Sequence, residues 1–174
     1  EFLEALPPLF AERSDLRAVI AGGLPGNRRA EERWIRRWQR DAGAHADRLQ
    51  FVGWLAPDAL SELYARATVL VVPSWFETFG QVCLEGMLHG TPIVTTGAGA
   101  LADLVDAASA KLIEPRSAEA IVGGVKGVLG DPGAANQRRA AALERARAVC
   151  RWDDRIGEML QLYRQAMTRG VRAV

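Results

Sequence analysis

Short apolar runs alternate along the chain with longer segments in which apolar residues recur at helical spacing. A short continuous apolar run predicts a β-strand with both faces covered, as in a parallel sheet flanked by helices. Such runs are found at 16–23, 49–53, 69–73, 91–96 and 111–115. They predict the strands of one sheet.

The segments between and after these runs predict α-helices. Pro57 stands in the first turn of one, where its missing N–H removes no hydrogen bond, Gly90 ends another, and Ser117 suits the N-cap of a third. The predicted helices cover 29–45, 57–67, 81–90, 101–105, 117–129, 134–149 and 153–169. The alternation predicts an α/β fold, with a Rossmann-like, doubly wound parallel β-sheet and helices on both faces.

Composition sets limits on this picture. With 174 residues, 49% of them hydrophobic, the chain suits a single domain, residues 1–174, with a substantial core. The net charge of +1 and the absence of a polybasic arm argue against nucleic acid as a partner. No apolar run is long enough to span a bilayer and no signal peptide is visible, so membrane association stays undetermined.

The two cysteines, Cys83 and Cys150, belong to no CxxC motif or Cys/His cluster, so no structural metal is expected. So few cysteines favour a reducing, cytoplasmic location. The chain opens on EFLEALPPLF without an initiator methionine, which fits a fragment cut from a longer protein.

Loops follow four of the predicted strands, at 22–26, 53–56, 74–80 and 97–100, and three of them are rich in glycine or other small residues. Ligands of doubly wound sheets bind outside the carboxyl ends of the strands, and all four loops share that edge. Each alone is an ordinary turn, but together they favour a binding site. Neither a G-x-G-x-x-G fingerprint nor a P-loop is present, so phosphate binding is assigned to the helix that starts near 79–81.

Two glutamates, Glu77 and Glu85, lie around this helix start. A carboxylate accepts two hydrogen bonds in one plane and so matches adjacent hydroxyls of a sugar or a ribose. Carboxylates on both sides of a diphosphate-binding helix start therefore suit a nucleotide sugar. Each also has a simpler interpretation, Glu85 in a buried ion pair with a neighbouring arginine and Glu77 as a favourable charge at the helix N-terminus.

The segment PSWFETFGQVCLEGMLHGTPIVTT, residues 73–96, contains both glutamates as E-x7-E and resembles the retaining glycosyltransferases of family 4. Other stretches agree in the family's order and extend the resemblance over nearly the whole chain: FVGWL, LYARATVLVVPS, GALADLV, KLIEP and the closing W-x9-LY. That family has the two-domain GT-B fold. The resemblance implies that this chain is its C-terminal half, a nucleotide-sugar-binding domain.

The resemblance also implies roles for single residues. Glu77 binds hydroxyls of the donor sugar and orients it, which makes it the catalytic candidate, and Glu85 holds the ribose hydroxyls. The other implied contacts are Thr78, Phe79 and Gly80 beside the sugar, Gln81 and Val82 at the diphosphate, and Val52 and Leu55 around the nucleobase. Gly22 is added as a backbone contact from its place after the first strand. No metal and no separate cofactor is expected, because relatives of this kind need none and no Asp-x-Asp pair is present.

The sequence departs from the family pattern in several places. The arginine and lysine that contact the diphosphate are missing, as are the acceptor-binding N-terminal domain and its catalytic histidine. The usual Gly-Gly reads Gly99-Ala100, and the usual proline–acid pair reads Ala102-Asp103. The chain alone is expected to bind nucleotide sugar weakly and to transfer nothing, with the missing domain as its partner. Two alternatives stay open, a 2-epimerase-like GT-B domain and a non-catalytic nucleotide-binding module.

Several other residues have more than one interpretation. Trp75 either walls the sugar pocket or packs under its loop. The helix from 153 packs either on the missing domain or on its own. Trp34 and Trp38 are expected in the core or a domain interface, and His45 and His89 are expected to be structural.

Overall fold

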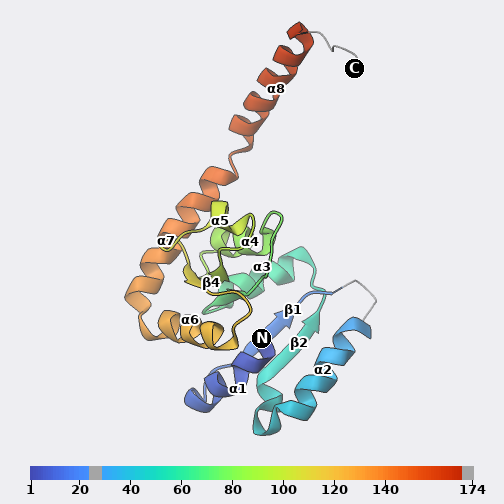
Figure 1. The fold of residues 1–174 in the computed structure, drawn as a ribbon, viewed down its shortest axis with the longest axis vertical. Coiled ribbons are helices and arrows are strands. Elements are labelled where there is room, and N and C mark those ends of the chain that lie inside the picture. The colour runs from blue at the N-terminus through green and yellow to red at the C-terminus, as the bar shows by residue number, and fades with distance from the viewer. Residues whose placement is uncertain (24–28, 170–174) are drawn as a thin grey trace.

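The computed structural model of the protein describes residues 1–23 and 29–169 (Figure 1). Its strands are β1 (Ala18–Ala21), β2 (Leu49–Gly53), β3 (Leu70–Val72), β4 (Ile93–Thr96) and β5 (Lys111–Ile113). Its helices are α1 (Phe2–Glu12), α2 (Arg29–Asp41), the 3₁₀ helix η1 (Gly43–Arg48), α3 (Pro57–Arg66), α4 (Gln81–Leu88), α5 (Leu101–Leu104), α6 (Ala118–Gly130), α7 (Pro132–Val149) and α8 (Trp152–Arg169). Every predicted strand and helix is present, which confirms the α/β fold.

All strand pairs are parallel, as predicted. Within the described residues they form two hydrogen-bonded ladders: β1 pairs with β2, and β3, β4 and β5 pair in that order. In the second ladder Leu70 lies opposite Ile93, and Val94 lies opposite Lys111. The parallel sheet is therefore divided into two pieces between β1 and β3.

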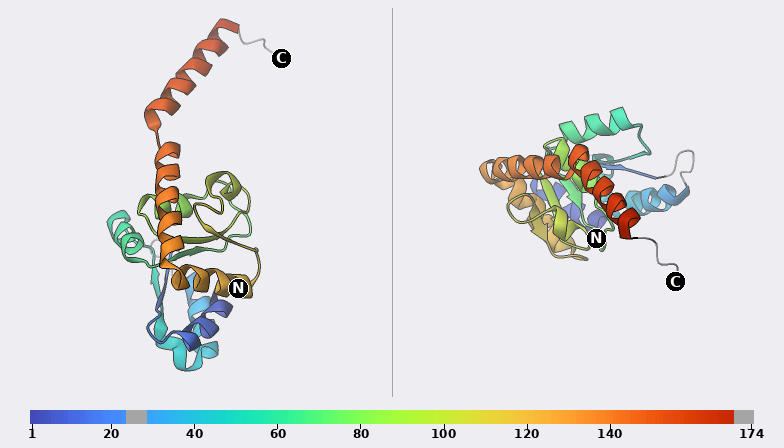
Figure 2. Two further views of the ribbon diagram at one scale, coloured as in Figure 1. Left: turned by 90° about the vertical axis from the view of Figure 1, so that its left-hand side faces the viewer. Right: turned by 90° about the horizontal axis from the view of Figure 1, so that it is seen from above.

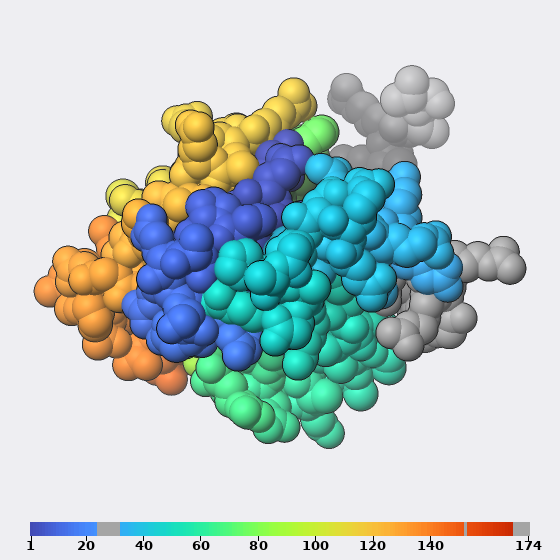
Figure 3. Space-filling view, turned by 90° about the horizontal axis from the view of Figure 1, so that it is seen from below, coloured from blue at the N-terminus to red at the C-terminus, as the bar shows by residue number. Residues whose placement is uncertain are grey.

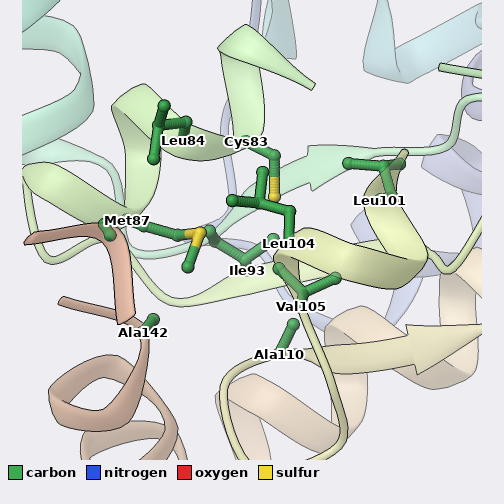
Figure 4. Packing of buried hydrophobic residues seen from close by; sticks show 10 residues of the cluster. Cys83, Leu84, Met87, Ile93, Leu101, Leu104, Val105, Ala110 and Ala142 are labelled. Carbon is green, nitrogen blue, oxygen red and sulfur yellow. The ribbon is translucent and has the colours of Figure 1, made fainter. Parts of the chain in front are cut away.

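Helices cover both faces of β4, whose residues are all buried. Ile93 and Val94 point to opposite sides, because successive side chains of a strand alternate. On one side Ile93 packs in a cluster with α4, α5 and α7 that includes Met87 and Leu104 (Figure 4). On the other side Val94 packs with α1 and α6. The apolar side of α4 is thus fixed on the sheet, and this fixes the residues that precede the helix.

α1 is the helix that the sequence reading missed. Pro7 and Pro8 stand inside it and remove N–H groups that would otherwise be paired, which argues against a helix at this point. Burial outweighs that cost, because apolar residues recur along one helix face. The buried residues of α1 are Ala5, Leu6, Leu9 and Phe10.

α1 spans the division between the two ladders. Ala5 and Leu9 pack in the cluster of β4 and α6, whereas Leu6 and Phe10 pack in a separate cluster with α2 and β2. Figure 3 shows α1 between α6 and the α2–η1 segment on this side of the molecule. The buried Arg48 donates a hydrogen bond of 2.7 Å to the main-chain oxygen of Phe10 and strengthens this contact. α1 therefore holds the two pieces together from one face.

Three aromatic predictions near α1 can be checked. Trp38 is buried, and its indole N–H donates to the main-chain oxygen of Ala46 at 3.1 Å, which confirms its place in the core. Trp34 is 41% exposed, so a place in the core is wrong for this residue. The ring of His45 packs edge-on against Phe10 with 5.9 Å between ring centres, so this histidine has the expected structural role.

α8 does not pack on its own domain. It extends away from the strands beyond the end of α7 (Figures 1 and 2). Its large apolar side chains are exposed: Ile156, Met159, Leu160, Leu162, Tyr163 and Met167. Of the two alternatives for this helix, packing on its own domain is therefore not found. None of the described helices has the length and apolar character needed to cross a bilayer.

Candidate functional site

The loop that follows β3 carries Glu77, and β4 fixes this loop. Thr95 Oγ1 donates a hydrogen bond of 2.9 Å to the main-chain oxygen of Val72, and Thr96 Oγ1 donates one of 2.6 Å to that of Ser74. Ser74 Oγ in turn donates to Glu77 Oε1 at 3.1 Å. A chain of hydrogen bonds thus connects the half-buried carboxylate to the most buried strand of the sheet and limits its orientation.

The loop after β4 lies directly against Glu77. The N–H of Ala100 donates to the main-chain oxygen of Glu77 at 2.9 Å. Gly99 has a φ of +62°, and a Cβ atom built on it would lie 2.3 Å from the same oxygen. Only glycine fits both the backbone conformation and this close approach. The structure therefore brings two of the predicted loops, 74–80 and 97–100, into contact.

α4 begins without a side-chain cap. Its N-cap residue is Gly80, whose φ is +82°, and a Cβ atom there would lie 2.8 Å from Leu101 Cδ2. Residues 78–79 and the first helical residues, Gln81 and Val82, are exposed. The N–H groups at a helix start lack intrahelical partners and carry the positive end of the helix dipole, which favours anions.

Glu85 lies one turn further along α4 and is held by a tyrosine. Tyr64 of α3 donates its hydroxyl to Glu85 Oε2 at 2.9 Å, and burial together with this carboxylate raises the pKa of Tyr64. In the part of the chain that the structure describes, neither Glu77 nor Glu85 belongs to an ion pair. The alternative of a buried ion pair with an arginine is therefore not found for Glu85, which keeps one carboxylate oxygen for another donor.

Two neighbours of Glu85 have structural roles. His89 contacts the main-chain oxygen of Glu85 through Nδ1 at 2.8 Å and the hydroxyl of Ser61 through Nε2, and not the carboxylate. Cys83 is fully buried, and burial together with the Glu77 charge raises its pKa to about 12. Its thiol is therefore protonated at neutral pH and serves as a small apolar side chain.

The remaining predicted contacts lie at the ends of β1 and β2. The N–H of Gly22 donates to the main-chain oxygen of Gly53 at 2.9 Å and joins these two strand ends. Val52 and Leu55 are half-buried, and Trp54 between them is 52% exposed. The structure gives no contact between these residues and the two glutamates.

A hollow of about 620 Å³ opens beside Gly22. Residues of α1, α2, β1 and β2 line it together with Pro73, which begins the loop of Glu77. Glu77 and Glu85 do not line it. The predicted contacts thus form two groups, one around the start of α4 and one at the ends of β1 and β2, and Pro73 lies where these groups meet.

The sequence of residues 1–131 matches the family described as glycosyl transferases group 1. The chain belongs to this family. It is 36% identical over 168 residues to a D-inositol 3-phosphate glycosyltransferase from Acidothermus cellulolyticus. The matched region covers 96% of this chain and 36% of that protein.

Solved structures show the same fold. Sucrose-phosphate synthase from Thermosynechococcus elongatus is similar with a TM-score of 0.78 and 30% identity, over 97% of this chain and 43% of that one. The Anabaena protein Alr3699/HepE, solved in complex with UDP, has a TM-score of 0.76 and 22% identity, over 92% of this chain and 44% of that one. This chain therefore has the fold of GT-B glycosyltransferases and spans less than half the length of these relatives.

Sequence reasoning missed Arg116 in this glycosyl transferase group 1 chain. Arg116 follows β5, has a φ of +62°, and places its guanidinium carbon 4.5 Å from the ring centre of Trp75. Trp75 is 56% exposed and therefore does not pack under its loop, and a cation–π contact holds it instead. No motif or spacing connects these two residues, because only the fold brings the ends of β3 and β5 together.

The site of this glycosyl transferase group 1 chain offers groups for hydroxyls and anions. Across residues 1–23 and 29–169, no group of three or more His, Cys, Asp and Glu side chains is placed to hold a metal ion. What the loops present is two carboxylates, the uncapped start of α4, and an exposed indole with a guanidinium over it. These groups suit hydroxyls, an anion and an apolar ring face, respectively.

Proposed function

We propose that this chain is the donor-binding domain of a retaining glycosyltransferase and binds a nucleoside-diphosphate sugar. The arrangement around α4 carries the proposal: Glu77 stands before the uncapped helix start, and Glu85 lies one turn inside the helix. A diphosphate at the helix start has room for a hydroxylated ring at either end. Each carboxylate is then within reach of one ring.

The predicted contacts divide along such a ligand. The N–H groups of Gln81 and Val82 bind the diphosphate, Glu77 binds the sugar hydroxyls, and Glu85 binds the ribose hydroxyls. Trp75, whose ring face is exposed beside Glu77, covers the apolar face of the sugar. The nucleobase lies toward the ends of β1 and β2, where Gly22, Val52 and Leu55 contact it.

Two observations support a nucleotide as part of the ligand. The Anabaena neighbour was solved in complex with UDP, and it shares this fold over 92% of the present chain. The start of α4, which has no side-chain cap and has exposed first residues, also suits a diphosphate.

In the longer protein we expect glycosyl transfer with retention at the anomeric carbon. The nucleoside diphosphate leaves, and the N–H groups at the start of α4 stabilise its charge. Glu77 orients the sugar, while an acceptor-binding N-terminal domain supplies the acceptor. The present chain alone binds the donor weakly and transfers nothing. The two unpaired cysteines, Cys83 and Cys150, favour a cytoplasmic enzyme.

A binding screen of UDP, GDP and ADP sugars against the longer protein tests the proposal. Glu85→Ala should weaken every nucleotide that carries the ribose by about tenfold to a hundredfold, because hydrogen bonds to a carboxylate contribute about 1.5–3 kcal/mol. Glu77→Ala should weaken the sugar conjugate by a similar factor and leave the free nucleoside diphosphate unchanged. Isothermal titration calorimetry with matched pairs of ligands measures both effects.

Glu144→Ala is the matched control, because Glu144 lies exposed on α7, away from the candidate site. It should leave the affinity of every ligand unchanged. Equal losses for sugar conjugate and free diphosphate in the Glu77 variant would contradict the assigned roles. Unchanged binding in both glutamate variants would overturn the proposed function.

A further inference from the structure

Arg116 has a backbone conformation that an arginine rarely adopts. Its φ is +62°, and among the residues that the structure describes no other residue besides glycine has a positive φ. A Cβ atom is crowded in this left-handed region, so the conformation is unfavourable for arginine. Backbone strain of this kind is frequent at binding sites, where the surrounding structure imposes it. The turn after β5 is therefore a place to look for a function.

The strained turn brings the Arg116 side chain to Trp75 across the sheet edge. Arg116 follows β5, Trp75 follows β3, and β4 lies between these strands. Neighbouring strands lie about 4.8 Å apart, so the ends of β3 and β5 are roughly 10 Å apart. The guanidinium carbon nevertheless lies 4.5 Å from the centre of the Trp75 ring. The two side chains together thus bridge the carboxyl end of β4.

The loop after β4 leaves room for this bridge. It reads Gly97-Ala98-Gly99-Ala100, so none of its side chains is larger than a methyl group. A Cβ atom built on Gly97 would meet nothing within 4 Å. The space above the end of β4 is therefore open to the two longer side chains from its neighbours.

Arg48 shows what a structural contact of the same kind looks like in this chain. Its guanidinium carbon lies 4.3 Å from the ring centre of Phe10, and the side chain is buried. Its N–H groups donate to the main-chain oxygens of Phe10, Arg13 and Leu16. Every part of this guanidinium thus serves the packing of α1.

Arg116 differs in both respects. It is exposed, and within residues 1–23 and 29–169 its guanidinium donates no hydrogen bond and forms no ion pair. The N–H donors of a guanidinium all lie in its plane, whereas a cation–π contact uses its flat face. Trp75 therefore holds the cation in place and leaves its donors available.

The pair lies beside the carboxylate assigned to the sugar. Only Phe76 separates Trp75 from Glu77 along the loop, and Trp75 itself is 56% exposed. Glu77 accepts a hydrogen bond from Ser74 at 3.1 Å and does not pair with Arg116. The described contacts thus give the cation no role in neutralising this carboxylate.

We propose that Trp75 and Arg116 form a subsite for an anionic group, a carboxylate or a phosphate, next to the sugar that Glu77 orients. The in-plane N–H groups of Arg116 donate to two oxygens of the anion, a geometry that suits both groups. Arg116 is then a specificity-determining residue that favours an acidic substrate over a neutral one. The anionic group belongs to the transferred sugar, as in a hexuronic acid, or to the acceptor that meets it. The inference rests on the proposed function.

Calorimetry on the longer protein tests the sugar as the source. It compares nucleoside-diphosphate glucose with nucleoside-diphosphate glucuronic acid, which add or omit one carboxylate on the same ring, with the base that the binding screen selects. The glucuronic acid conjugate should bind about tenfold more tightly, and Arg116→Gln should remove this difference without weakening the glucose conjugate. Arg116→Lys keeps the charge but not the planar pair of donors, and should retain only part of the difference.

Inorganic phosphate tests the acceptor as the source. It is titrated into the longer protein with the glucose conjugate bound, and stands in for the anionic group of an acceptor. If this is the source, the two conjugates bind equally, phosphate binds, and Arg116→Gln weakens phosphate about tenfold. Absence of both effects in the unsubstituted protein, or their persistence in Arg116→Gln, would overturn the proposal. That result, with the glucose conjugate still bound, rejects the subsite alone, whereas failure of every nucleotide sugar to bind rejects the proposed function as well.

Arg17→Gln is the matched control. It makes the same change in net charge, but Arg17 immediately precedes β1 and so lies at the amino ends of the strands, opposite the loops of the site. It should leave the preference between the conjugates and the affinity for phosphate unchanged. Equal effects of Arg17→Gln and Arg116→Gln would show a general effect of charge and overturn the proposal.

Arg116→Gly separates recognition from stability. Glycine relieves the positive φ, and this gain offsets the lost cation–π contact. The midpoint of thermal unfolding should therefore fall by no more than about 2–4 °C, while the preference for the anionic group is lost. A larger fall would show that Arg116 is kept for stability and would contradict the proposal.

Discussion

The two ladders differ in how completely they are buried. The central strand of the β3–β4–β5 ladder is buried along its whole length, and helices cover both of its faces. In the β1–β2 ladder only Leu49 is buried, and the other strand residues are half-buried or exposed. Both ladders have strand-like sequences, so the difference comes from their neighbours and not from their own composition.

The candidate site follows the same division. Glu77 and Glu85 lie on the well-buried piece, where hydroxyls of β4, the tight turn at Gly99 and the Tyr64 hydroxyl hold their surroundings. Val52 and Leu55 lie at the end of the less buried piece, with no comparable contacts. The half of the site around α4 is therefore attached to the well-buried ladder, and the half assigned to the nucleobase depends on the less buried one.

The largest expected effect is on the free energy of unfolding, when an isoleucine is replaced by alanine in each ladder separately. Ile93 of β4 is 2% exposed, so Ile93→Ala should lower the free energy of unfolding by about 2–5 kcal/mol through lost burial and a cavity. Ile20 of β1 is half-buried and lines the hollow, so Ile20→Ala should cost about 1 kcal/mol. Urea unfolding of the two variants, followed by circular dichroism, measures the difference. Equal costs in the two variants would show that the two ladders do not differ in stability as their burial indicates.

A smaller effect is expected at the loop that supports Glu77. Gly99→Ala places a Cβ atom against the main chain of Glu77 at a positive φ, and such strain costs about 1–3 kcal/mol. The loop must move to relieve it, so affinity for a sugar conjugate should fall together with stability. Thermal unfolding and calorimetry measure the two losses.

Gly123→Ala is the control for this loop. A Cβ atom at Gly123 of α6 meets nothing within 4 Å, and alanine favours the helix, so this variant should gain about 0.5–1 kcal/mol. The two glycine substitutions should thus have opposite signs. A gain in stability for Gly99→Ala would contradict the packing of the two loops.

Local patterns were sufficient for most of the fold and for the residues around α4. Apolar periodicity gave the strands and helices, Pro57 and Ser117 stand at the predicted helix starts, and Ser117 Oγ accepts a hydrogen bond from the N–H of Ala120 at 3.0 Å. The segment from Glu77 to Glu85 is continuous in sequence, so its place at a strand end and helix start followed from the pattern alone.

What the sequence did not predict depends on contacts between distant segments. α1 was missed because Pro7 and Pro8 argue against a helix, while the burial that outweighs them comes from two separate clusters. Arg116 meets Trp75 only because β5 and β3 belong to one ladder. The division of the sheet was also invisible, because an apolar run has the same sequence whether or not both of its neighbours are present.

The smallest expected effect concerns Tyr64. Its substitution tests whether Tyr64 supports Glu85 or contacts the ligand directly. Tyr64→Phe removes the hydrogen bond to Glu85 Oε2 and leaves the ring in place. A hydrogen bond of this kind contributes about 0.5–1.5 kcal/mol, so nucleoside diphosphate affinity should fall by about threefold to tenfold. Because Tyr64 acts through Glu85, the double variant with Glu85→Ala should bind no more weakly than Glu85→Ala alone.

Tyr163→Phe makes the same chemical change on the exposed surface of α8 and should have no effect on binding. Additive losses in the double variant would mean that Tyr64 contacts the ligand itself, and the comparison would then place a further binding residue on α3.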